Sequence, residues 1–76
     1  MPIHSIEDDS GMHCVDFIDD EHGAVCFKVF RKDPEDEGKW TLVADYSKTV
    51  FPDQAQALVA AAARIAWLQQ VLAQRN

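Results

Sequence analysis

The C-terminal third of the chain, from Asp53 to Asn76, has the pattern of one long helix with apolar residues on two opposite faces. At about 100° per residue, one apolar stripe holds Leu58, Ala61, Ile65, Leu68 and Leu72. The opposite side carries a second set, Ala60, Ala63, Trp67 and Val71. A chain of 76 residues has a single core, which covers one face of such a helix. The second face is therefore expected to meet a partner.

The start of this helix has a clear local signal. Asp53 followed by Gln56 is typical of a capping box, and Pro52 restricts the chain just before it. Several alanines favour helix, and no later residue breaks the pattern. The sequence therefore predicts one helix over residues 53–75, more than about 20 residues and about 30 Å long. Strands of six to eight residues measure roughly 20 to 27 Å, so the far end of the helix is expected to protrude.

Apolar and polar residues alternate over much of residues 12–51, which is typical of an antiparallel meander. The apolar residues that share a face in the first two strands are Val15, Phe17, Val25, Phe27 and Val29. A hairpin register that pairs odd residues with odd residues brings them together as the core face. One such register sets Asp16 opposite Lys28.

A third strand is expected after the acidic turn at residues 33–38, with Trp40, Leu42, Ala44 and Tyr46 alternating along it. Residues 1–11 form either an edge strand or a loose arm. The whole chain, residues 1–76, is read as a single domain of the α+β class. An antiparallel sheet of three or four strands packs on one long C-terminal helix.

Charge is distributed unevenly along the chain. The net charge is −6, and residues 1–27 hold seven acids and no Lys or Arg. An acidic surface repels phosphates and anionic lipids, so binding to nucleic acids or membranes is not expected. The chain has no signal-peptide pattern and no uncharged apolar stretch that spans a bilayer, so we expect a soluble, cytoplasmic protein. Cys14 and Cys26 are expected to be buried, reduced thiols.

Two groups of residues resemble metal-binding sites, but neither meets the requirements of one. The acidic turn matches the early part of a calcium loop, but the position that needs a bidentate Glu is Ala44. Two thiols and two imidazoles lie around the first hairpin, but His13 and Cys14 are consecutive on a strand and point to opposite faces. We therefore expect no bound metal and no cofactor.

Nothing in the chain has a diagnostic catalytic setting. There is no nucleophile elbow, and three glycines do not make a phosphate-binding loop. So short a chain also leaves little volume for a substrate pocket. We expect a protein that is not an enzyme and has no small-molecule substrate.

Trp67 has two interpretations. In the first, Trp67 and Val71 anchor a partner while the small side chains of Ala60 and Ala63 let another helix approach closely. In the second, Trp67 is covered by the N-terminal arm, where Ile3 and Ile6 are available. The sequence leaves both open.

Part of the chain resembles small bacterial domains of unknown function that consist of a meander and one helix. The shared features lie within residues 38–68: a Trp early in a strand (Trp40), a Phe just before the helix cap (Phe51), and a helix that reads Ala-Leu-x-x-Ala-x-x-x-Ile-Ala from Ala57. The resemblance implies the fold and no activity.

The function expected from these observations is a non-enzymatic module that binds a protein partner or forms a homodimer. Its binding surface would be the outer face of the C-terminal helix, at Ala60, Ala63, Trp67 and Val71.

Two alternatives belong to other classes. An acidic decoy that imitates DNA and binds a basic protein would use Glu7, Asp8, Asp9, Asp16, Asp19, Asp20 and Glu21. A weak binder of single-stranded nucleic acid would use Lys28, Lys32 and Lys39 together with an exposed Phe30 on the sheet face away from the helix.

Overall fold

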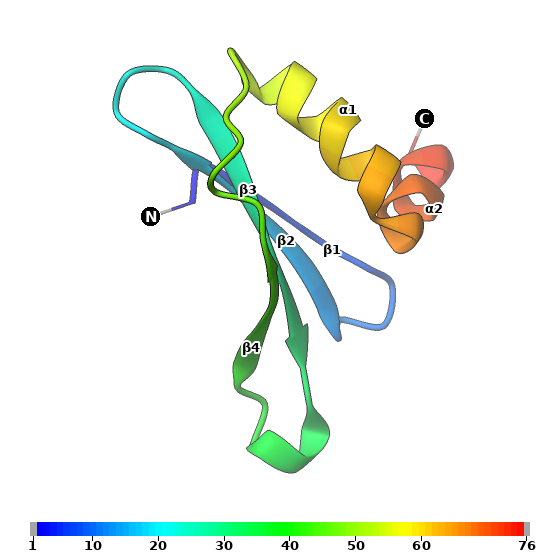
Figure 1. Ribbon diagram of the computed structural model, residues 1–76. Helices are drawn as coiled ribbons and strands as arrows, with labels where there is room; N and C mark the ends of the chain where they lie inside the picture. Colours follow the sequence, from blue (N-terminus) through cyan, green and yellow to red (C-terminus); the bar gives the residue numbers. More distant parts are fainter. Residues whose placement is uncertain (1, 76) are drawn as a thin grey trace.

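A computed structural model describes residues 2–75 of the protein, in which four strands are followed by two helices. The strands form one antiparallel sheet in chain order: β1 (His4–Glu7), β2 (His13–Asp19), β3 (Val25–Lys32) and β4 (Trp40–Asp45). A short 3-10 turn, η1 (Pro34–Asp36), lies between β3 and β4, and α1 (Gln54–Arg64) and α2 (Ala66–Gln74) complete the chain. Figure 1 shows both helices on one side of the sheet.

The α+β class and the antiparallel sheet are confirmed, with four strands in the sheet. The fourth strand comes from residues 1–11, which contribute β1 as an edge strand. Met1, the first residue of the predicted arm, and Asn76, which follows the predicted helix, lie outside the described residues. Within residues 2–75, no helix is long and apolar enough to cross a membrane.

The register predicted for the first hairpin is confirmed. Asp16 lies opposite Lys28, and the flanking pairs join Val15 to Val29 and Phe17 to Phe27. These pairs put large apolar side chains on the helix side of the sheet. The buried core consists of Ile6, Val15, Phe17, Val25, Phe27, Val29, Ala57, Ala61, Ile65, Leu68 and Val71.

Strand β4 departs from simple alternation. Val29 pairs with Ala44, but the next residue of β3, Phe30, pairs with Leu42, so Val43 has no partner of its own on β3. An extra residue of this kind interrupts the ladder and breaks the alternation of faces along the strand. Ala44 is half-buried in the core, whereas Trp40 and Leu42 are exposed. The predicted alternation of these residues along a regular strand is thus wrong beyond Val43.

The prediction of one long helix over residues 53–75 is also wrong. The N-cap is correct, because the Asp53 carboxylate accepts a hydrogen bond from the Gln56 N–H at 2.8 Å. The helix is interrupted at Ile65, whose φ of −119° and ψ of 102° are extended. The two resulting helices have 11 and 9 residues. Figure 1 shows α2 turned away from the line of α1.

The interruption has a physical explanation in the packing. A straight helix would run beyond the short sheet, whereas the turn at Ile65 lets Ile65, Leu68 and Val71 all reach the core. The Ala62 carbonyl, near the end of α1, accepts a hydrogen bond from Gln69 Nε2 at 2.6 Å. Burial of α2 thus replaces the predicted protruding end.

Candidate functional site

The four residues predicted to bind a partner do not gather on one open face. Ala60 is half-buried and Ala63 exposed, and both lie on α1. Trp67 is half-buried against the core and Val71 is 8% exposed, both on α2. The placement of Val71 on an outer face is therefore wrong. The turn at Ile65 changes the direction of the second helix and brings this side of α2 toward the sheet.

Trp67 lies beside the turn between β1 and β2. Its ring centroid is 6.1 Å from that of His13, and a hollow of about 270 Å³ between α2 and the turn is lined by Trp67, Asp8, Asp9, Ser10, Gln70, Val71 and Gln74. Of the two arm residues considered as a cover, Ile6 is in the core and Ile3 is exposed. The turn at residues 8–13 is therefore the neighbouring segment at the indole.

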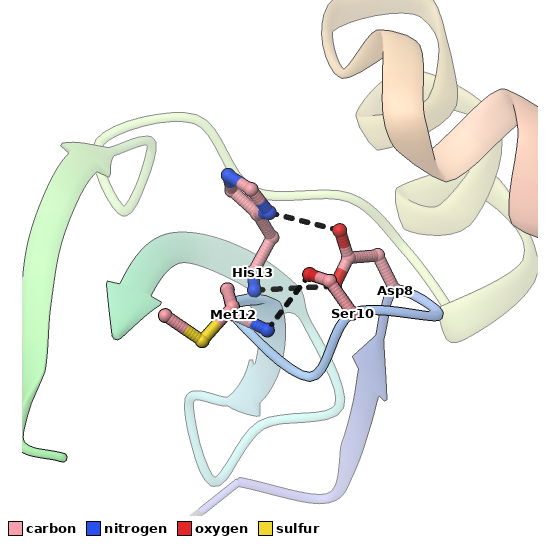
Figure 2. A network of polar contacts seen from close by, with 4 residues as sticks. All are labelled: Asp8, Ser10, Met12 and His13. Carbon is pink, nitrogen blue, oxygen red and sulfur yellow. Dashed lines mark hydrogen bonds and ion pairs between the residues drawn. The ribbon is translucent and has the colours of Figure 1, made fainter. Parts of the chain in front are cut away.

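Figure 2 shows the polar network that holds this turn. The Ser10 hydroxyl donates to Asp8 Oδ1 at 2.8 Å and accepts the Met12 N–H at 3.1 Å. The other oxygen of Asp8, Oδ2, lies 2.8 Å from His13 Nδ1. Burial acts to raise the pKa of Asp8, but the hydrogen bonds from Ser10 and His13 act against it, and the net pKa lies below its ordinary value.

The outer side of α1 carries an apolar surface. Val59 is 72% exposed, more than the other exposed large apolar side chains. A shallow hollow of about 360 Å³ beside it is lined by Phe51, Ala55, Gln56, Val59 and Ala60. The idea that the helix has a second apolar side therefore applies to α1, with Val59 as its largest exposed residue.

A second apolar surface lies on β4, at the edge of the sheet. Trp40 is 39% exposed, Leu42 49% and Val43 56%. We call these three residues the β4 edge. Figure 1 shows the β3–β4 hairpin extending away from both helices, so no helix lies along its tip. An edge strand exposes unpaired backbone groups, and apolar side chains beside them favour the addition of another strand.

The other edge strand, β1, is protected by its composition. It has four residues and exposes His4, Ser5 and Glu7, with Ile6 alone turned into the core. Short, polar edge strands pair poorly with other chains. The two edges of the sheet are therefore not equivalent: β1 is short and polar, whereas β4 carries exposed apolar side chains.

The sheet face away from the helices holds a hollow of about 240 Å³ around Cys14. The hollow is lined by Ser5, Glu7, Cys14, Asp16, Phe30 and Trp40. Burial raises the pKa of the Cys14 thiol to about 12, helped by its hydrogen bond to Asp16 and by the charges of Asp16 and Glu7. A thiol this far from ionisation is a poor nucleophile at neutral pH.

Of the three lysines proposed to bind nucleic acid, Lys28 and Lys32 lie beside acidic or aromatic residues, and Lys39 is exposed. Lys28 is paired in register with Asp16 on one side and Asp45 on the other. The Lys32 ammonium lies 4.7 Å from the centre of the Trp40 ring. Phe30, expected to be exposed, is half-buried. The binding of single-stranded nucleic acid through Lys28, Lys32 and Lys39 gains no support from this arrangement.

Six of the seven acids proposed for a DNA-like decoy lie near the two ends of β2, and the seventh, Asp16, lies in the middle of that strand, opposite Ser5 and Lys28. Glu7, Asp8 and Asp9 are at the turn before β2, and Asp19, Asp20 and Glu21 are at the turn after it. The Asp20 carboxylate accepts hydrogen bonds from the N–H groups of His22 and Ala24 at 2.8 and 3.1 Å. Such contacts stabilise a turn and do not arrange charges in a row along one surface.

Metal-binding side chains are dispersed in the part of the chain that the structure describes. There, no three His, Cys, Asp or Glu side chains lie close enough together to hold a metal ion. Cys14 and Cys26 are free, buried thiols. In the β1–β2 turn, Asp8 contacts His13 and Ser10. These residues do not form a set of metal ligands.

Comparisons of the chain with protein-family models, with curated proteins and with solved structures find no match. The resemblance of residues 38–68 to small bacterial meander-plus-helix domains therefore stays a prediction.

The β4 edge is not among the binding surfaces predicted from the sequence. The position of the strand in the chain indicates this edge. In a meander that ends in a helix, the last strand is the edge of the sheet unless the chain turns back. The sequence predicts a regular alternating strand through Trp40 and Leu42, because the extra residue at Val43 has no compositional mark.

Proposed function

We propose that this protein is a non-enzymatic protein-binding module whose partner is a second copy of its own chain. The observation that supports the proposal is that several large apolar side chains are exposed to solvent on a single copy. Among residues 2–75, six such side chains are exposed: Ile3, Trp40, Leu42, Val43, Val50 and Val59. A domain of 76 residues gains stability when such side chains leave water.

The helices and strand β4 carry little of the acidic charge. Residues 54–74, which form the helices, contain no acid and one base, Arg64. Residues 39–45, which contain β4, carry one base and one acid, Lys39 and Asp45, and so no net charge. Two copies with a charge of −6 each repel one another least where neutral surfaces meet. The outer face of α1 meets this condition, and β4 itself is neutral although the acidic turn at residues 33–38 comes directly before it.

Sedimentation equilibrium over a concentration series tests the proposal. One chain has a mass of 8.5 kDa, and we expect the weight-average mass to rise toward twice that value as the concentration increases. The rise should persist in about 0.5 M salt. Salt screens the repulsion between the acidic copies, whereas it does not screen apolar contacts. A mass of one chain at every concentration up to the millimolar range would contradict the proposal.

A further inference from the structure

The proposed self-association leaves open which surface the two copies share. We infer that the β4 strands of two copies pair in antiparallel orientation, which joins the two sheets into one sheet of eight strands. The inference rests on the proposed function and adds the surface, the orientation and the residues in contact. Three observations support it.

The first observation is the state of the strand itself. β4 is an edge strand of six residues, and its residues from Trp40 to Val43 are all exposed. Within residues 2–75, no strand lies beside the backbone groups on its outer side. An added strand would satisfy them and at the same time cover apolar side chains.

The second observation is the placement of charge along the strand. Lys39 lies just before β4, and Asp45 is its last residue; both side chains are exposed. Antiparallel pairing of two copies brings Lys39 of each near Asp45 of the other, because the start of one strand meets the end of the second. Parallel pairing would place like charges side by side. The charge pattern is therefore self-complementary in one orientation.

The third observation concerns the extra residue of β4. Leu42 lies at the middle of the segment from Lys39 to Asp45, directly before the extra residue Val43. When Lys39 of each copy lies opposite Asp45 of the other, the two-fold axis passes through Leu42, and Val43 of each copy lies opposite Thr41 of the other. The two Leu42 side chains then meet at the axis, with a charge pair at each end.

The arrangement also fits the rest of the fold. A two-fold axis perpendicular to the sheet keeps the helices of both copies on the same side of the joined sheet. The hairpin tip that carries β4 extends away from the helices in Figure 1, so the second sheet can continue without displacing α1 or α2.

A matched pair of arginine substitutions tests the surface. Leu42 is 49% exposed on β4 and Val50 is 52% exposed in the segment after it. In sedimentation equilibrium, L42R is expected to raise the dimer Kd at least about tenfold, since two arginines would meet at the axis. V50R should leave the Kd within about twofold of the natural protein.

A charge exchange tests the orientation. K39E and D45K are each expected to raise the Kd about fivefold, because each creates two like-charge contacts per dimer. The double variant K39E/D45K restores opposite charges and should bring the Kd back to within about twofold. Asp45 also accepts the Ser47 N–H at 2.8 Å, so thermal unfolding of each variant is recorded; if D45K unfolds, K39E and L42R decide the result.

The outcomes separate this inference from the proposed function. If the protein dimerises but L42R changes nothing, the inference is wrong and self-association uses another surface; V59D, on the outer face of α1, would then be expected to dissociate the dimer. If the charge-exchange variant is weaker than either single variant, the antiparallel orientation is wrong. A natural protein that is monomeric throughout overturns both proposals.

Discussion

Asp8 is the residue on which the β1–β2 turn depends. Its two carboxylate oxygens contact the Ser10 hydroxyl and the His13 ring, and Oδ1 also accepts the His13 N–H at 3.3 Å. The ring of His13 in turn lies beside Trp67. One carboxylate thus connects the turn of the sheet to the neighbourhood of α2, and its ionised form is the one these contacts favour.

The pH dependence of stability follows from this preference. Because the pKa of Asp8 is lower in the folded protein than in the unfolded chain, its ionised form stabilises the fold above the ordinary carboxyl pKa of about 4. This contribution is lost as the pH falls through the folded value. D8N should therefore be less stable than the natural protein at pH 7, and the difference should shrink by pH 3.

Urea unfolding of the natural protein and D8N at pH 7, 5 and 3 measures this difference. D9N is the matched control, because Asp9 is an exposed neighbour in the same turn. If D8N loses as much stability relative to the natural protein at pH 3 as at pH 7, then shape rather than charge matters at this position.

At the scale of elements, the junction between α1 and α2 depends on a side chain. The freed carbonyl of Ala62 is bound by Gln69 Nε2, so Q69M, which keeps the length of the side chain, should lower the free energy of unfolding by about 1 kcal/mol. Gln54, in the first turn of α1, is the contrast. Its buried amide atoms have no hydrogen-bond partner among residues 2–75, so Q54M should be neutral or stabilising.

Chemical denaturation of both variants provides the measurement. Equal losses of stability in Q69M and Q54M would mean that the Gln69 contact adds nothing at the junction. A loss confined to Q69M supports the view that the interruption at Ile65 is specifically stabilised and is not a random fraying of one helix.

The elements differ in how far the sequence predicts them, and the reason is physical. The β2–β3 register follows from alternation, because a shift by one residue would expose Phe17 and Phe27 together. The N-cap at Asp53 is a local signal that needs no tertiary context. Both were predicted correctly.

The features that failed depend on tertiary packing. Ile65 lies inside an apolar stripe with neither Pro nor Gly beside it, and the helix turns there because the short sheet offers no support farther along. That turn brings Val71 into the core and separates it from Ala63. The residues of the predicted binding face therefore do not share one surface. The extra residue of β4 likewise depends on its pairing with β3.

At the scale of the whole molecule, one side of the sheet is occupied by helices, one edge is short and polar, and the other edge is apolar. This asymmetry gives the protein a single direction in which the sheet can grow. When two β4 strands pair, no apolar edge is left for a further copy, because each copy then presents only its polar β1 edge to the solvent. The account predicts a closed dimer and no longer polymer.

Amide hydrogen exchange, followed residue by residue at two protein concentrations, tests the central claim most directly. At a concentration where the protein is dimeric, amides between Trp40 and Asp45 that face away from β3 should exchange more slowly than in the dilute monomer, while those of β1 should be unchanged. Exchange in β4 that does not depend on concentration, or new protection confined to α1, would contradict the pairing of β4 strands.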